Sequence, residues 1–306
     1  MTTQRTKSRL PRPVSLLLRP WEEAVVVIVG VGGTGSWLAT HVARLACVLQ
    51  ARGKKIRLIF IDPDVVEEKN IYRQNFCDAD LAQDSPLHNA SSLSFRLGLA
   101  LGVNASAICE EFDPYMLDGY PHRIYGHDRS TERITIVVSC VDNAAARKSV
   151  FKVLEANRPY EAPSFWVLDC GNFPANAGDE CGQVYLGSAA TPEALEYAFG
   201  ITNRCLALPS PALQAPDLLI ARPEELAQSP LSCAEITRVN EQGLMINPLI
   251  ASWAASYLFA MLVTGDLRLM GTSINLTQGR VDSDYITQEN VAKVIGKEVS
   301  FFKKKR

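Results

Sequence analysis

Three groups of residues in this 306-residue chain have the types and spacing to bind a phosphorylated ligand. The first is a glycine-rich turn, where a phosphate can approach the main chain because no Cβ blocks it. The second group lies within residues 62–74 and combines carboxylates with an amide and an arginine. The third lies within residues 142–147. The turn comprises Gly30, Gly32, Gly33, Thr34, Gly35 and Ser36. Together these groups favour nucleotide chemistry.

The elements that must position these groups follow from hydrophobic patterning. A β-branched apolar run at residues 25–29 precedes the turn, a helix-compatible segment at 37–49 follows it, and a second apolar run covers 56–61. This order predicts a strand–turn–helix–strand unit, with the free N–H groups of the helix start facing an anion. Asp62 closes the second strand, where its carboxylate can accept hydrogen bonds from both ribose hydroxyls. The alternative is a glycine turn that only lets the helix pack on the strand.

The polar residues after the second strand narrow the class of nucleotide protein. Asp62, Asp64, Asn70, Arg73 and Gln74 follow one another in that order, and an Asp-Asn-Ala-Ala-Ala-Arg run follows at 142–147. This string resembles the ThiF/MoeB/HesA superfamily, the ubiquitin-activating-type adenylating enzymes. The resemblance extends from about residue 25 to about 190, and more loosely to 265.

The resemblance implies roles for individual residues. The glycine turn and the 62–74 group would bind ATP, with Asn70, Arg73 and Gln74 positioning its phosphates. Asp142 would bind the Mg²⁺ that bridges the phosphates. Asp142 has a structural alternative, because an Asp at this place can cap the next helix. Arg147 is expected to be structural.

One position departs from the family pattern. Relatives begin the next helix with a lysine that contacts the phosphates, in the pattern K-A-x-x-L-x-x-R, and this chain has Asn89 there, preceded by His88. Three alternatives follow: His88 or another cation substitutes for the lysine, the enzyme is slow, or the protein binds nucleotide without catalysing the reaction. The last alternative describes a scaffold that docks the same partner.

Composition excludes several other functions. The net charge of −2 gives no general attraction to nucleic acid or to an anionic membrane. The eight cysteines contain no C-x-x-C pair, so we expect no zinc site. The start of the chain lacks a signal-peptide pattern, so we expect a reduced, cytoplasmic protein. The apolar segment 247–265 is expected to be a buried core or interface helix and not a membrane span.

The first twenty residues form a basic, proline-punctuated arm. In relatives, an arginine upstream of the first strand reaches into the nucleotide site of the partner subunit, which implies a homodimer. Arg9, Arg12 and Arg19 are the candidates, and we choose Arg12. A solvated arm is the alternative for each of them.

Ten of the seventeen prolines fall within residues 159–248 and break this region into short pieces. In the family, such a region crosses over the tail of an acceptor protein and can carry a nucleophilic cysteine. Cys233 is the candidate nucleophile, with Cys205 as the alternative, because a thiolate at a helix start has enhanced reactivity. Many buried cysteines are inert, and some relatives stop at the adenylate.

We therefore expect an α/β fold with a Rossmann-like, mostly parallel sheet, helices on both faces, a proline-rich crossover and two C-terminal strands within 273–287. The expected units are a basic arm (1–20), an ATP-binding adenylation core (21–190), a crossover with the catalytic cysteine (191–245) and a C-terminal completion (246–306). The resemblance implies ATP-dependent adenylation of the C-terminal carboxylate of a ubiquitin-like or sulfur-carrier protein, with a conjugating enzyme as a further partner. The finer likeness is to the ThiF-family proteins of the bacterial PRTRC system. A NAD-dependent oxidoreductase would explain the glycine turn and Asp62 but not the later motifs.

Overall fold

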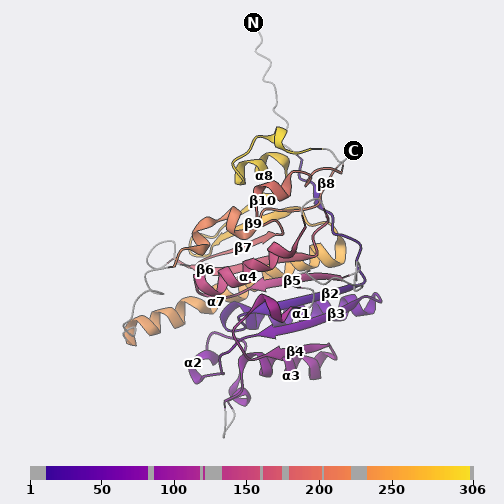
Figure 1. The fold of residues 1–306 in the computed structure, drawn as a ribbon. Helices are drawn as coiled ribbons and strands as arrows, with labels where there is room; N and C mark the ends of the chain where they lie inside the picture. Colours follow the sequence, from indigo (N-terminus) through magenta and orange to yellow (C-terminus); the bar gives the residue numbers. More distant parts are fainter. Residues whose placement is uncertain are drawn as a thin grey trace, which may run out of the picture.

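The protein is built around an eight-stranded sheet with the strand order β10-β9-β7-β6-β5-β2-β3-β4 (Figure 1). The computed structural model describes residues 12–81, 86–117, 120, 133–158, 161–173, 179–201, 203–221 and 233–303, and for 173 and 233–243 only the backbone. The sheet has a parallel part, which carries the nucleotide motifs, and an antiparallel extension.

Five neighbouring strands are parallel, and the β-branched apolar runs of the sequence form their buried centres. They are β2 (Glu23–Val29), β3 (Lys55–Ile61), β4 (Ala105–Ile108), β5 (Arg133–Ser139) and β6 (Phe165–Phe173). Strand β4, at the edge of the sheet, ends at Ile108. The carboxyl ends of central strands are followed by the glycine turn, by Asp62 and by Asp142. In parallel sheets of this kind, ligands bind at the edge formed by these strand ends.

Helices cover both faces of the sheet. Alternate residues of β2 enter two separate cores, with Val26 on one face and Val27 on the other. The first face is covered by α1 (Gly33–Ala51), α3 (Asn89–Leu101) and α7 (Cys233–Phe259), and the second by α4 (Ala144–Phe151) with the 3₁₀ turn Lys152–Ala156. The predicted α/β fold with a Rossmann-like sheet is confirmed.

The antiparallel extension consists of β7 (Cys181–Gly187), β9 (Leu269–Asn275) and β10 (Arg280–Tyr285). The two predicted C-terminal strands are present, and they extend the main sheet. The first of them begins four residues earlier than expected, at Leu269.

Helix α7 differs most from the sequence-based prediction. It begins at Cys233, inside the region expected to be broken by prolines, and continues through Pro248 into a π-helical turn at Ala260–Thr264. The part Leu244–Thr264 is long and apolar enough to cross a membrane by length and composition, but half of its most apolar window is buried inside the protein. A core helix passes the same test, so this is weak evidence for a span.

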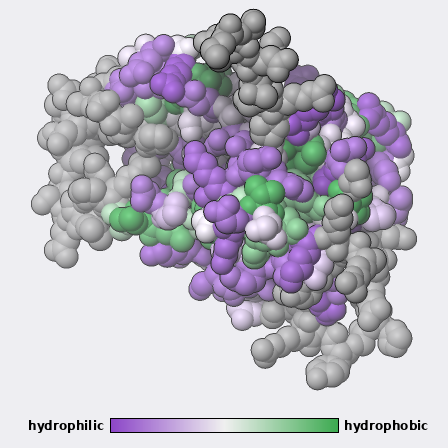
Figure 2. Space-filling view, turned by 90° about the horizontal axis from the view of Figure 1, so that it is seen from above, coloured by the Kyte–Doolittle hydropathy of each residue, from purple (hydrophilic) through white to green (hydrophobic). Residues whose placement is uncertain are grey.

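In the view of Figure 2, apolar residues appear as small separate patches on a mostly hydrophilic face.

The remaining elements are short. Strand β1 pairs in parallel with β8, and this small sheet ties the start of the described chain to the segment after β7. The short strands and helices are β1 (Ser15–Leu16), β8 (Arg204–Cys205), α2 (Glu68–Ile71), α5 (Pro211–Gln214) and α8 (Gln288–Val294). The other 3₁₀ turns are Asp78–Asp80, Pro114–Met116, Pro192–Leu195, Pro216–Leu219 and Val299–Phe301.

Candidate functional site

The glycine turn is shorter than predicted, because α1 begins at Gly33 and not at Trp37. Thr34, Gly35 and Ser36 therefore form the first turn of the helix. Gly30 has φ +79°, and a Cβ there would lie 2.8 Å from the carbonyl oxygen of Cys140. A Cβ on Gly35 would lie 2.0 Å from the carbonyl oxygen of Gly30. No side chain caps this helix start, so its N–H groups are available to an anion.

Asp62 stands at the end of β3 with its carboxylate almost fully engaged. Its Oδ2 accepts the Val31 N–H (2.7 Å), and its Oδ1 accepts the Asp64 N–H (2.8 Å) and Nδ2 of Asn89 (3.3 Å). Burial raises the pKa of Asp62, and the two backbone hydrogen bonds oppose this shift. Since a carboxylate offers about four lone-pair positions, roughly one remains. Accepting both ribose hydroxyls would require one of these three bonds to give way.

Asn89 is buried at the first position of α3. Its Nδ2 serves Asp62, and its Oδ1 has no hydrogen-bond partner among the described residues. His88 lies at the N-cap position of the helix, with Nδ1 3.1 Å from the carbonyl oxygen of Pro63. The side-chain amide of Asn89, which stands where relatives have the lysine, thus binds Asp62, the residue predicted to bind the ribose.

Arg73 and Gln74 lie on the loop after α2, beside the glycine turn. Nε2 of Gln74 is 3.4 Å from the place where a Cβ on Gly32 would stand. Burial lowers the pKa of Arg73, and the charge of Asp142 opposes this shift, so the guanidinium and this carboxylate interact. Nε of Arg73 and Oε1 of Gln74 are buried without a partner among the described residues. Because buried polar groups are normally paired, these two atoms could donate to and accept from a polar ligand at the glycine turn. The neighbouring Asn70, the last predicted phosphate-positioning residue, is buried on α2.

Asp142 is exposed on the loop after β5 and does not cap α4. Asn143 is the cap, because its Oδ1 accepts the Ala146 N–H (2.8 Å), and its Nδ2 donates to Oδ1 of Asp142 (3.2 Å). The described residues hold no group of three or more acidic, histidine or cysteine side chains suited to a metal. A single carboxylate fits Mg²⁺, which keeps several waters and binds substrate phosphates.

Arg147 holds the loop that carries Asp142. It forms a buried ion pair with Asp169 of β6, with Nε 2.9 Å from Oδ1, and its Nη2 donates to the carbonyl oxygen of Val141 (2.9 Å). Burial raises the pKa of Asp169, and the Arg147 charge opposes the shift. The structural role predicted for Arg147 is thus given a physical basis.

The two candidate cysteines differ in their surroundings. Cys205 is fully buried on β8, and burial raises the pKa of its thiol to about 12. Such a thiol is not a nucleophile at neutral pH, which argues against the alternative choice of Cys205. Cys233 is the first residue of α7, and its side chain lies outside the described part of the structure.

Asn247 of α7 is a site residue that the sequence did not single out. It is buried, and its Oδ1 accepts hydrogen bonds from Oγ1 of Thr34 (3.1 Å) and Nδ2 of Asn172 (2.7 Å). It therefore joins α7 to the first turn of α1 and to the end of β6. Asn247 lies fourteen positions after Cys233 on this helix, or roughly 21 Å along the axis. The only feature of the sequence that could have drawn attention to Asn247 is its place directly before Pro248.

Arg12 does not join these residues within its own chain in any described contact. It lines a cavity of about 390 Å³ together with residues from 199–204 and 287–289. Arg19 is half-buried, and Arg9 lies outside the described residues. Whether Arg12 completes a partner's site remains a prediction.

The fold and these residues define a Rossmann-like protein with an anion-accepting glycine turn. The ThiF family model matches residues 14–160, which contain the glycine turn, Asp62, Arg73 and Asp142. This part of the chain is therefore similar to the ThiF family. No curated protein sequence matches the chain.

Solved structures with a similar fold include two of MccB from E. coli. The complex with MccA-N7isoASN has 16% identity and a TM-score of 0.50, covering 89% of this chain and 67% of that one. The complex with ATP has 16% identity and a TM-score of 0.47, with the same coverage. A selenomethionine PaaA structure has 14% identity and a TM-score of 0.48, covering 86% and 64%. The chain thus spans about two thirds of the length of these structures.

Proposed function

We propose that this protein is an ATP-dependent adenylating enzyme that activates the C-terminal carboxylate of a small protein or peptide. The observation that carries the proposal is a pair of buried polar atoms, Nε of Arg73 and Oε1 of Gln74, which have no hydrogen-bond partner among the described residues. Gln74 lies beside the glycine turn, and the charge of Asp142 acts on Arg73. These groups form a cationic and amide surface where the phosphates of a nucleotide on the turn would lie.

In the proposed reaction, an oxygen of the acceptor carboxylate attacks the α-phosphorus of ATP. The bond from that phosphorus to the bridging oxygen of the β-phosphate breaks, and pyrophosphate leaves with the electron pair. No proton transfer is required, because the carboxylate is already an anion at neutral pH. The helix start and Arg73 hold the phosphates and offset the charge that develops. Asp142 would hold Mg²⁺, which neutralises phosphate charge when bound.

The acceptor is the less defined part of the proposal. The MccB structure with a TM-score of 0.50 is a complex with MccA-N7isoASN, and the family resemblance of the sequence points to a ubiquitin-like or sulfur-carrier protein. We infer a protein or peptide tail with a free carboxylate. A homodimer, thioester transfer to Cys233 and a conjugating enzyme as a further partner belong to the same proposal.

A second candidate function is a nucleotide-binding scaffold for the same acceptor. Asn89 favours it, because the amide at the lysine position donates to Asp62 and provides no positive charge at the phosphates. Arg73 is then the main cation of the site, and adenylation is slow or absent.

Pyrophosphate–ATP exchange separates the two functions. Small proteins and peptides with a free C-terminal carboxylate would be compared with their C-terminally amidated forms. Exchange with the carboxylate forms alone supports adenylation. The scaffold function would be supported instead if the wild type binds ATP but shows no exchange with any acceptor, and if an Asn89→Lys variant then shows exchange.

A further inference from the structure

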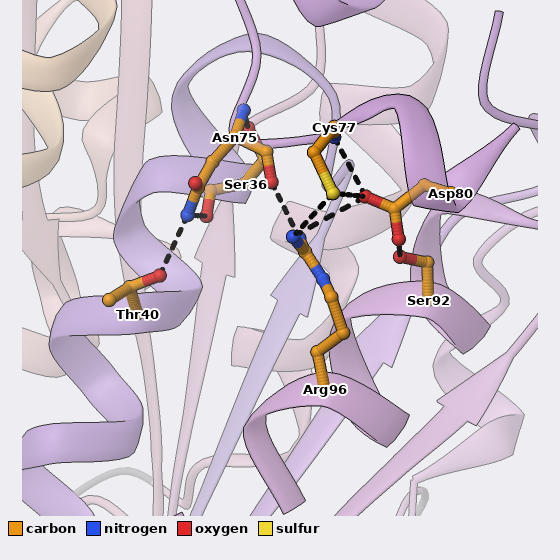
Figure 3. A network of polar contacts seen from close by, with 7 residues as sticks. All are labelled: Ser36, Thr40, Asn75, Cys77, Asp80, Ser92 and Arg96. Carbon is orange, nitrogen blue, oxygen red and sulfur yellow. Dashed lines mark hydrogen bonds and ion pairs between the residues drawn. The ribbon is translucent and has the colours of Figure 1, made fainter. Parts of the chain in front are cut away.

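The loop that carries Arg73 and Gln74 is held between two helices by a continuous polar network (Figure 3). In this view, side chains of α1 lie on one side of the loop and side chains of α3 on the other. We call this network the brace. Its members are Ser36, Thr40, Asn75, Asp80, Ser92 and Arg96.

The α1 side of the brace is centred on Asn75. Its Nδ2 donates to Oγ1 of Thr40 (2.7 Å) and to the carbonyl oxygen of Ser36 (3.2 Å). Its backbone N–H donates to Oγ of Ser36 (2.9 Å). The carbonyl oxygen of Arg73, two residues before Asn75, accepts a hydrogen bond from Nε1 of Trp37 on α1 (3.2 Å). The backbone on both sides of Gln74 is thus fixed to the first turns of the helix that begins at the glycine turn.

The α3 side is centred on Arg96. Nη2 of Arg96 donates to the carbonyl oxygen of Asn75 (2.6 Å), and Nη1 lies 3.3 Å from Oδ2 of Asp80. Asp80 is nearly fully buried and also accepts the Cys77 N–H (2.9 Å) and the hydroxyl of Ser92. The planar guanidinium therefore serves two acceptors in fixed directions, which a lysine cannot reproduce.

Nε of Arg73 and Oε1 of Gln74 make no hydrogen bond to a described residue, so these two atoms do not help to hold their side chains in place. Their placement depends on the backbone that the brace holds. We propose that Asn75 and Arg96 are positioning residues, which set phosphate recognition by keeping Arg73 and Gln74 against the glycine turn. The inference rests on the proposed function, because it assigns the phosphates to this site.

The test compares ligands with and without phosphates. Asn75→Ala removes both side-chain donors to α1 but keeps the backbone N–H bond. We expect it to weaken ATP binding about tenfold, as measured by calorimetry, and to change adenosine binding less than about twofold, because only phosphate contacts lie on the displaced loop. Arg96→Lys should act in the same direction. Ser94→Ala, on α3 but outside the brace, is the matched control and should change neither affinity.

A double variant shows whether Asn75 acts through Arg73. Once Arg73→Ala has removed the guanidinium, adding Asn75→Ala should weaken ATP binding little further. Fully additive losses, or equal losses for ATP and adenosine, would overturn the inference.

Hydrogen exchange in the ligand-free protein separates this inference from the proposed function. Asn75→Ala should speed exchange of the amides of residues 70–77 more than Ser94→Ala does, and unchanged exchange there would refute the brace. If the wild-type protein binds no ATP, the proposed function is refuted. The hydrogen-exchange result would still show whether the brace holds the loop.

Discussion

At the scale of single residues, Asp62 and Arg147 show how burial assigns different roles to charged groups. Asp62 uses its carboxylate to join the glycine turn, its own loop and Asn89. Arg147 pairs with Asp169 inside the protein and holds the loop of Asp142 by its backbone. The contacts of Asp62 fix its carboxylate at the proposed nucleoside site, and those of Arg147 keep the proposed metal ligand Asp142 in place.

Removing one partner of the buried pair should be costly. Arg147→Ala leaves Asp169 as an unpaired buried carboxylate, so we expect a loss of about 3–5 kcal/mol in the free energy of unfolding by urea. The double variant Arg147→Met/Asp169→Leu removes both charges and should recover most of that loss. Arg158→Ala, which breaks a largely exposed pair with Glu161, is the control and should change stability little. Arg147→Ala with wild-type stability would contradict the buried pair.

The cysteines provide a test that depends on pH. The pKa of Cys205, raised to about 12, keeps its thiol protonated at pH 8, so iodoacetamide should not label it in the folded protein. Cys77 is exposed and should be labelled. As pH rises from 9 toward 12, the folded chain keeps a proton that the unfolded chain loses, so stability should fall over this range. Mass spectrometry of the labelled peptides is the measurement, and native labelling of Cys205 would be contrary to this placement.

At the scale of elements, the contact between α1 and α7 links the nucleotide turn to the crossover region. Asn247 accepts hydrogen bonds from Thr34 and Asn172 and so cannot move freely. A Cβ on Gly33 would lie 2.8 Å from its Nδ2. The glycine at this position is therefore required by the packing of α7, independently of its proposed role toward a phosphate.

Gly33→Ala should destabilise the protein by about 1–3 kcal/mol, because the pinned amide of Asn247 must shift. In an Asn247→Ala background the same change should cost at least ~0.5 kcal/mol less. Gly98→Ala on α3 is the matched control, since its Cβ meets only ordinary contact at 3.6 Å and alanine favours a helix. Urea unfolding measures all four variants. Strictly additive effects of the first pair would show that the two residues do not touch.

The sequence predicted the elements that depend on local pattern and missed those that depend on distant contacts. The parallel strands follow from β-branched runs such as residues 25–29, and Asp62 and Asp142 could be placed at strand ends for that reason. Helix α7 was expected to begin near 246, although no proline interrupts residues 231–247. That uninterrupted interval was the available signal. The roles of Asn247, Asn75 and Arg96 could not be predicted, because each depends on partners brought together by folding.

At the scale of the whole molecule, Arg73 is the one cationic side chain that the described part of a single chain places at the proposed phosphate site. Arg12 lines a separate cavity of its own chain. The proposed homodimer would place Arg12 of one subunit in the nucleotide site of the other, where it would add charge that Asn89 does not supply.

Mixing two inactive variants tests this arrangement. Arg12→Ala and Asp142→Ala should each lose adenylation, and heterodimers formed from both should regain one intact site, or about a quarter of full activity after random reassociation. The measurement is pyrophosphate exchange before and after subunit exchange. Activity that stays absent in the mixture, or an Arg12→Ala protein with full activity, would rule out a contribution across the dimer.

The central claim is that this chain binds ATP with Mg²⁺ at the glycine turn. The most direct measurement is a thermal-unfolding titration with ATP plus Mg²⁺ and, separately, with NAD, for the wild type and Asp142→Ala. At 100 times its dissociation constant, ATP should stabilise the wild type by ~2.7 kcal/mol. Asp142→Ala should lose the part of this stabilisation that depends on Mg²⁺. Stabilisation by NAD and not by ATP, or by neither, would contradict the account.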